Sequence, residues 1–138
     1  MINVALGGTL HTDIYAVYEQ APKMRTVLPK KRVSIMPGTQ LDRILRCNPC
    51  QVNALHHQSV DRLGRDLRIA AEDEIGIVQA IESETAPFLL GVQWHPELLF
   101  WKAPQQRLFA ALAEAVRKAA IEVRLSILTA ENQGARRA

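Results

Sequence analysis

The amino-acid sequence predicts an α/β protein, because strand-like and helix-like segments alternate along its 138 residues. The clearest strand is the unbroken apolar run over residues 88–92, which is typical of a strand buried on both faces of a sheet. The clearest helix begins at Pro104, where apolar side chains recur at helical spacing. These apolar positions are Leu108, Phe109, Leu112, Val116 and Ala119.

The first third of the chain is predicted to hold the end of one helix, a short strand and a short helix. Residues 1–6 form the last turns of a helix that Gly7 stops, since glycine readily adopts the conformation that ends helices. Residues 32–35 form a short strand. Thr39 is placed to cap the amino-terminal end of a helix over residues 40–45.

The middle of the chain is predicted to add further strands. Residues 52–55 form a second strand, and residues 67–71 and 77–82 form a pair of strands. The connection between these two strands contains Gly76, which can supply the positive φ that a tight turn often requires.

Composition limits the class of protein. A hydrophobic content of 48% with 22% charged residues is typical of a globular protein, and no apolar run approaches the ~18 residues of a membrane span. The net charge of +3 comes with only 5% aromatic residues, which argues against a nucleic-acid partner. We therefore expect no membrane and no nucleic-acid contact, a cytoplasmic location, one domain over residues 1–130 and a disordered tail over residues 131–138.

The most informative motif is a histidine and a carboxylate that flank a proline. In extended backbone, His95 and Glu97 project to the same side, and Pro96 between them cannot donate to a sheet ladder. An imidazole held by a carboxylate keeps one tautomer and can accept a proton from a thiol or hydroxyl. The motif therefore predicts a general base with its orienting carboxylate, although no nucleophile is visible in the chain.

Three blocks of sequence, in order and at matching spacing, carry a resemblance to a known family. They are residues 3–11 (NVALGGTLH), 52–58 (VNALHHQ) and 90–97 (LGVQWHPE). With these blocks the chain resembles the γ-glutamyl hydrolases of the class I glutamine amidotransferase type, the peptidase C26 group. The resemblance covers residues 1–120 and implies the C-terminal portion of a flavodoxin-like, three-layer αβα fold.

The resemblance also implies a thiol-dependent mechanism. In such proteins a cysteine in a Gly-x-Cys-x-Gly-x-Gln elbow forms a γ-glutamyl thioester, and this elbow precedes the position of Asn3. We expect the elbow and the N-terminal half to be absent from this chain. The implied roles are general base for His95, orienting carboxylate for Glu97, and hydrogen bonding to the glutamyl group for His56 and Gln58. No cofactor is implied.

Other polar residues allow further interpretations. Cys47 and Cys50 have the spacing of a dithiol redox pair or of two metal ligands, but a strand follows them and no further ligand has recognisable spacing. We expect the pair to be reduced and incidental, and no metal to bind. Ser59 lacks the glycines of a nucleophile elbow, and His11 with Asp13 is expected to be structural or to flank the pocket.

The sequence thus favours the C-terminal half of a γ-glutamyl amide hydrolase that is inactive alone. Glutamine, γ-glutamyl-γ-aminobutyrate or another γ-glutamyl amide would fit as substrate. Because an uncovered apolar sheet edge pairs readily with another chain, we expect the missing half, a companion polypeptide or a second copy to cover it. The alternatives are a non-catalytic interaction module derived from the family by truncation and, more weakly, a small dithiol redox protein.

Overall fold

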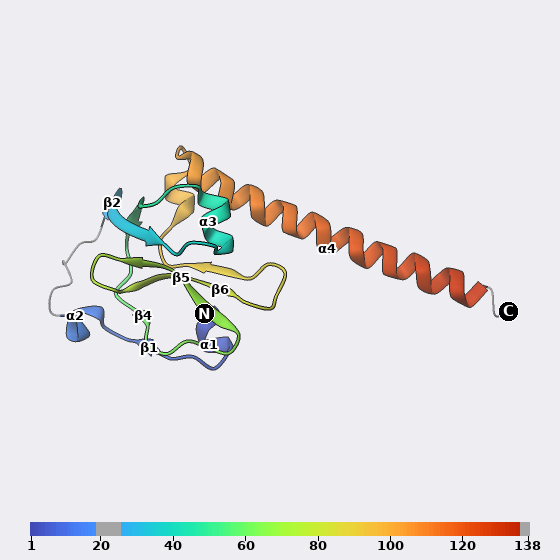
Figure 1. Cartoon of the computed structure of the whole chain (residues 1–138), viewed down its shortest axis with the longest axis horizontal. Helices are drawn as coiled ribbons and strands as arrows, with labels where there is room; N and C mark the ends of the chain where they lie inside the picture. The colour runs from blue at the N-terminus through green and yellow to red at the C-terminus, as the bar shows by residue number, and fades with distance from the viewer. Residues whose placement is uncertain (19–25, 136–138) are drawn as a thin grey trace. The chain divides into compact units, whose positions relative to one another are not determined.

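The computed structural model describes residues 1–18 and 26–135 of the chain (Figure 1). The chain divides into two compact units, Met1–Leu108 and Phe109–Ala138. The first unit contains all the described strands and the short helices, and the long helix α4 continues through the second. The elements are α1 (Ile2–Ala5), β1 (Leu10–His11), α2 (Ile14–Val17), β2 (Thr26–Ile35), α3 (Gln40–Leu45), β3 (Cys50–Ala54), β4 (Ser59–Val60), β5 (Leu67–Asp73), β6 (Val78–Ser83), β7 (Leu90–Val92), the 3₁₀ helix η1 (Pro96–Leu99) and α4 (Ala103–Ala135).

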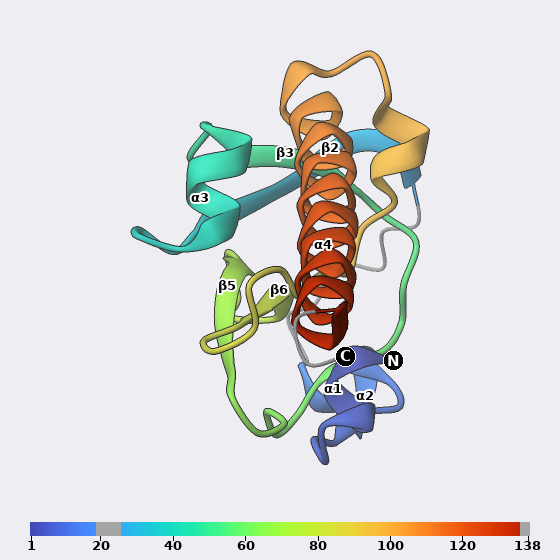
Figure 2. The same cartoon turned by 90° about the vertical axis from the view of Figure 1, so that its right-hand side faces the viewer.

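The strands of the first unit form two sheets, and Figure 2 labels β2, β3, β5 and β6 of the larger one. The larger has the order β3-β2-β5-β6-β7, and its described neighbours are all antiparallel. The smaller pairs β1 with β4. The predicted hairpin is present as β5 and β6, and its turn holds Gly76 at φ +81°. The prediction of an α/β protein is confirmed.

Strand β2 is longer than predicted. It extends from Thr26 to Ile35, whereas the sequence indicated a strand over residues 32–35 only. Pro29 lies where the register between β2 and β3 shifts, a position at which the missing N–H does not break a regular ladder. Lys30 and Lys31, which follow it, gave no apolar signal, so this part of the strand was missed.

Helix α3 has the predicted bounds and covers part of the main core. The Thr39 side chain accepts a hydrogen bond from the N–H of Asp42, as expected of an N-cap. Leu41 and Leu45, one turn apart, are both fully buried. They belong to a core cluster that also contains Val33, Ile35, Cys50, Val52, Ala70, Ala71, Ala80, Trp94, Leu99 and Leu108.

Two expectations from the carboxyl-terminal half need correction. Strand β7 is three residues long and only half-buried, so the strand predicted over residues 88–92 is not buried on both faces. The reason is that β7 ends the sheet order, and one of its sides has no strand partner among the described residues. Helix α4 begins at Ala103, and of its predicted apolar positions Leu108 is buried whereas Phe109 is exposed.

The domain limits and the location stay predictions. The tail expected over residues 131–138 includes 136–138, which lie outside the described residues, and α4 is drawn to Ala135. Among residues 1–18 and 26–135, no helix is both long and apolar enough to cross a membrane.

Candidate active site

His95 and Glu97 meet at the turn that follows β7. The Nδ1 atom of His95 lies 2.8 Å from Oε1 of Glu97. The contact arises differently from the predicted extended backbone, because Glu97 lies in the 3₁₀ helix η1, which Pro96 opens. Proline suits this first helical position, where its missing N–H is not needed.

The electrostatics of the pair follow from this contact. The hydrogen bond from His95 is the main cause that lowers the pKa of the Glu97 carboxyl, and the charge of a protonated imidazole lowers it further. Since a carboxylate only accepts hydrogen bonds, Nδ1 carries a proton in the pair and Nε2 is the ring nitrogen available for proton transfer. The side chains are 46% and 57% exposed, respectively, so both can be reached from solvent.

His56 lies in the loop between β3 and β4 and is half-buried. Its Nδ1 lies 2.9 Å from the carbonyl oxygen of Gln58, so Nδ1 donates and Nε2 is left unprotonated in the neutral ring. Burial is the main cause that lowers the pKa of His56. Gln58 is exposed and contacts His56 through its main chain, so its own side chain is free to point toward solvent.

A buried network of polar side chains lies next to His56, and sequence reasoning missed it. Lys31 Nζ lies 2.7 Å from Asp73 Oδ2, and the Gln79 amide donates to the same oxygen over 3.3 Å. Gln79 is completely buried, and neither its Oε1 nor the Nε2 of His56 has a hydrogen-bond partner among the described residues. The members of this network come from three strands. The spacing of polar residues along β5 and β6 was therefore the only sequence signal that indicated it.

Asn53 is a second residue that the sequence did not single out. It is completely buried in β3, and its side chain hydrogen-bonds the main chain of His95. Asn53 belongs to the same sequence block as His56. No described hydrogen bond joins His56 or Gln58 to the pair at 95 and 97.

The flanking residues have structural contacts. Asp13 caps α2 by accepting from the N–H of Tyr15, and His11 Nε2 lies 3.5 Å from Asp61 Oδ1. Trp94, next to His95, is 2% exposed and donates to Gln105, so it packs in the core. Trp101 is exposed and packs edge-on against Phe100.

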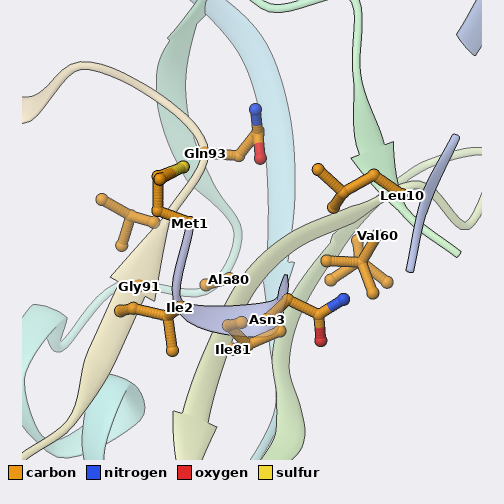
Figure 3. A pocket seen from close by; sticks show the side chains of 11 residues that line it. Met1, Ile2, Asn3, Leu10, Val60, Ala80, Ile81, Gly91 and Gln93 are labelled. Atoms are coloured by element: carbon orange, nitrogen blue, oxygen red, sulfur yellow. The ribbon is translucent and has the colours of Figure 1, made fainter. Parts of the chain in front are cut away.

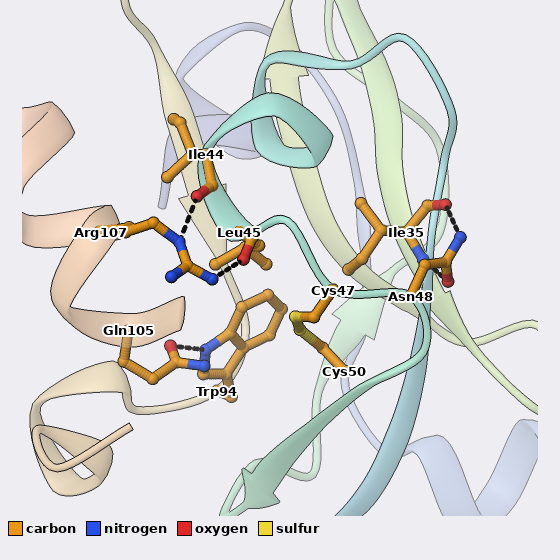
Figure 4. Close-up of a disulfide and its surroundings, with 9 residues drawn as sticks. All are labelled: Ile35, Ile44, Leu45, Cys47, Asn48, Cys50, Trp94, Gln105 and Arg107. Atoms are coloured by element: carbon orange, nitrogen blue, oxygen red, sulfur yellow. Dashed lines mark hydrogen bonds between the residues drawn. A yellow bond between two sulfur atoms is a disulfide. The ribbon is translucent and has the colours of Figure 1, made fainter. Parts of the chain in front are cut away.

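The state of the cysteines differs from the expectation. Cys47 and Cys50 are joined in a disulfide, not reduced (Figure 4). The loop after α3 turns back into β3 and brings the two Cα atoms to 5.4 Å, within the range that a disulfide spans. Cys47 follows the carboxyl-terminal end of α3, where the helix dipole does not favour a thiolate. Within the described part of the chain, no three His, Cys, Asp or Glu side chains converge as a metal site.

A pocket of about 250 Å³ lies beside the strand that leads to His95 (Figure 3). Side chains of α1, β6 and β7 form much of its wall, which is mainly apolar. Gln93, two residues before His95, contributes a polar group to it. The residues around the pocket are Met1, Ile2, Asn3, Leu10, Val60, Val78, Ala80, Ile81, Gly91, Val92 and Gln93.

Comparison with known sequences connects this geometry to a family. The sequence profile of peptidase C26 matches residues 1–97, which include the polar residues of both candidate groups. The chain belongs to the peptidase C26 family. This confirms the resemblance on which the predicted roles of His95, Glu97, His56 and Gln58 rest, while the roles themselves stay predictions.

Individual peptidase C26 relatives are similar over most of this chain. A glutamine amidotransferase-like protein of Rickettsia prowazekii is 41% identical over 123 residues, which cover 80% of this chain and 43% of that protein. The γ-glutamyl-γ-aminobutyrate hydrolase of Escherichia coli is 32% identical over 120 residues, covering 80% of this chain and 46% of that enzyme. The chain thus spans less than half the length of these two curated relatives.

Solved structures show the fold. A GMP synthase component from Thermoplasma acidophilum superposes with a TM-score of 0.63 at 20% identity, covering 86% of this chain and 55% of that chain. A glutamine amidotransferase from Thermotoga maritima gives a TM-score of 0.51 at 20% identity, covering 91% and 47%. The C26 chain therefore has the α/β fold of class I glutamine amidotransferases, as the sequence predicted.

Proposed function

We propose that this chain supplies the general base and the orienting carboxylate of a cysteine-dependent γ-glutamyl amide hydrolase. The observation that carries the proposal is the 2.8 Å contact between His95 Nδ1 and Glu97 Oε1 inside a block that matches the family. Glutamine or another γ-glutamyl amide is the substrate. The nucleophilic cysteine belongs to a polypeptide segment outside these 138 residues.

The proposed reaction uses the free nitrogen of the imidazole. His95 Nε2 accepts the proton of the cysteine thiol, and the thiolate attacks the γ-carbonyl carbon. The amine or ammonia leaves with the proton that the imidazolium returns, and a γ-glutamyl thioester remains. His95 then removes a proton from water, hydroxide attacks the thioester, and glutamate and the free thiol are released. Glu97 stabilises the imidazolium in both stages.

The nucleophile is assigned outside the chain because its own candidates are poorly suited to attack. Cys47 and Cys50 are consumed in a disulfide, and a bonded sulfur is no nucleophile. Ser59 is 1% exposed within β4, so a substrate carbonyl cannot approach its hydroxyl. His56 is also poorly placed to attack, because its Nδ1 contacts the carbonyl oxygen of Gln58 and its Nε2 is buried.

The test is hydrolysis of a γ-glutamyl anilide by the chain alone and by the chain joined to an amino-terminal segment that carries a Gly-x-Cys-x-Gly-x-Gln elbow. We expect no turnover from the chain alone and measurable turnover from the joined protein. His95→Gln should abolish that turnover, whereas the matched change His57→Gln, at an exposed histidine, should not. Turnover by the isolated chain, or activity that survives His95→Gln, would refute the proposal.

A second candidate is a non-catalytic interaction module, and the position of β7 favours it. This strand ends the described sheet order and borders the apolar pocket of Figure 3, so another polypeptide could add to the sheet there. If the chain alone binds the separate amino-terminal segment tightly but the joined protein hydrolyses nothing, this second function replaces the first.

A further inference from the structure

The side chain of one buried residue, Asn53, hydrogen-bonds the main chain of His95 on both its N–H and its C=O. The Oδ1 atom of Asn53 accepts from the N–H of His95 over 2.8 Å, and its Nδ2 donates to the carbonyl oxygen of His95 over 2.8 Å. Asn53 is completely buried in β3 and lies 42 residues away along the chain. Both polar groups of one residue are therefore satisfied by one amide.

These two hydrogen bonds replace strand pairing at the point where β7 has ended. The ladder of β7 finishes at Val92, and the N–H of Gln93 is taken by the carbonyl of Gln79. Beyond it, Asn53 is the described partner of the His95 N–H, and the carbonyl of His95 also accepts from the N–H of Leu98 in η1, over 3.2 Å. A buried polar group that loses its partner is costly, and the Asn53 amide is completely buried, so its two hydrogen bonds hold this turn in place.

The imidazole itself has little else to hold it. Its side chain is 46% exposed, and its described hydrogen-bond partner is Glu97, which is 57% exposed. An exposed ion pair of this kind is too weak to fix a ring by itself. The direction in which the ring leaves the main chain therefore depends on how the backbone at His95 is held.

We propose that Asn53 is the positioning residue of the base. It holds the backbone of His95 so that the imidazole stays within hydrogen-bonding distance of Glu97. The proposal rests on the proposed function only for its catalytic meaning. Asn53 touches no reacting atom and acts through His95. Without the amide, the turn is free to shift, and the imidazole and carboxylate no longer meet.

The chain offers a matched control in Asn48. Its side-chain amide forms the same pair of hydrogen bonds with the main chain of Ile35. Oδ1 accepts from the N–H over 3.1 Å, and Nδ2 donates to the carbonyl oxygen over 3.0 Å (Figure 4). Replacing Asn48 by alanine removes an equivalent pair of hydrogen bonds away from the turn at His95. Asn48 is exposed whereas Asn53 is buried, so Asn48→Ala controls for the loss of the two hydrogen bonds and not for burial.

The test is an NMR titration of the Glu97 carboxyl in the full 138-residue chain. Carbon-13 shifts give the pKa of Glu97 in the wild-type chain, Asn53→Ala, Asn48→Ala and His95→Gln, the last of which lacks the imidazole partner. We expect Asn53→Ala to raise the pKa of Glu97 to its value in His95→Gln, and Asn48→Ala to leave it at the wild-type value. A folded Asn53→Ala chain with the wild-type pKa, or an equal rise in Asn48→Ala, would overturn the proposal.

If Asn53→Ala does not fold, Asn53→Asp takes its place, because it conserves size and the acceptor for the His95 N–H. Its carboxylate acts on Glu97 directly, so the comparison is between Asn53→Asp with and without His95→Gln. We expect the pKa of Glu97 to differ less between these two chains than between the wild type and His95→Gln. An undiminished difference counts against the proposal.

The titration uses neither substrate nor nucleophile, so its outcome is separate from that of the hydrolysis assay. A protein that hydrolyses nothing can still show that Asn53 positions His95. Conversely, hydrolysis that depends on His95, together with an unchanged Glu97 pKa in Asn53→Ala, would leave the proposed function in place and remove this inference.

Discussion

The carboxylate of Glu82 reaches across from β6 and caps helix α3, accepting from the N–H of Leu41 over 3.0 Å. It also accepts from the N–H of Gln40 and from the guanidinium of Arg68. Glu82 is 1% exposed, so a buried charge is compensated by two main-chain donors, the positive end of a helix and one cation. This contact joins the sheet that leads to the site with the helix that covers its core.

We expect Glu82→Ala to destabilise the fold by about 3 kcal/mol, because it leaves two helix N–H groups and a guanidinium without their acceptor. The measurement is urea-induced unfolding followed by circular dichroism. Glu84→Ala, at an exposed position two residues later, is the control and should change the free energy of unfolding by less than about 0.5 kcal/mol. Equal effects of the two changes would contradict the capping role.

His56 should make the fold less stable as the pH falls. Its pKa is lowered in the folded chain by burial, so below the ordinary value of about 6.5 the unfolded chain binds more protons than the folded one. Acidification from pH 7 to pH 5 therefore favours unfolding. We expect His56→Gln to lose part of this dependence of the unfolding midpoint, and His57→Gln, at an exposed histidine, to retain it.

Glu97 should contribute slightly to the stability of the fold, and this contribution should disappear at low pH. Its folded pKa is depressed by His95, so its contribution is present above the ordinary carboxyl pKa and is lost as the pH falls through the folded value. Because both side chains are largely exposed, the contribution should stay below about 0.5 kcal/mol. Urea unfolding of Glu97→Gln at pH 7 and pH 3 measures it, and a larger loss at pH 3 than at pH 7 would contradict the sign.

Because its two cysteines are joined in a disulfide, we expect the chain to show no free thiol in a colorimetric assay. The chain is purified without reductant and unfolded in denaturant for this measurement. Reduction should lower the free energy of unfolding by about 2 kcal/mol, since the loop that the bond closes is short. Cys47→Ser should reproduce this loss without reductant. Two reactive thiols in the unreduced chain would restore the expectation of reduced cysteines.

Sequence reasoning succeeded where the signal and its partner are close along the chain. Thr39 caps α3 through Asp42, three residues away, and Gly76 turns β5 into β6 within one hairpin. The contact of His95 with Glu97 is of the same local kind. Each of these is fixed by backbone conformation over a few residues, which residue type and spacing reveal.

The sequence by itself therefore determined the α/β class, the family and the contact between His95 and Glu97. Only the tertiary structure decided that Asn53 hydrogen-bonds the main chain of His95, that Lys31 pairs with Asp73 and that β7 forms a half-buried end of the sheet. These relations join residues that are tens of positions apart, and a buried amide in a strand has the same appearance in the sequence whichever main chain it meets. The hydrogen-bond partners of buried polar groups are chosen by packing, which one sequence does not display.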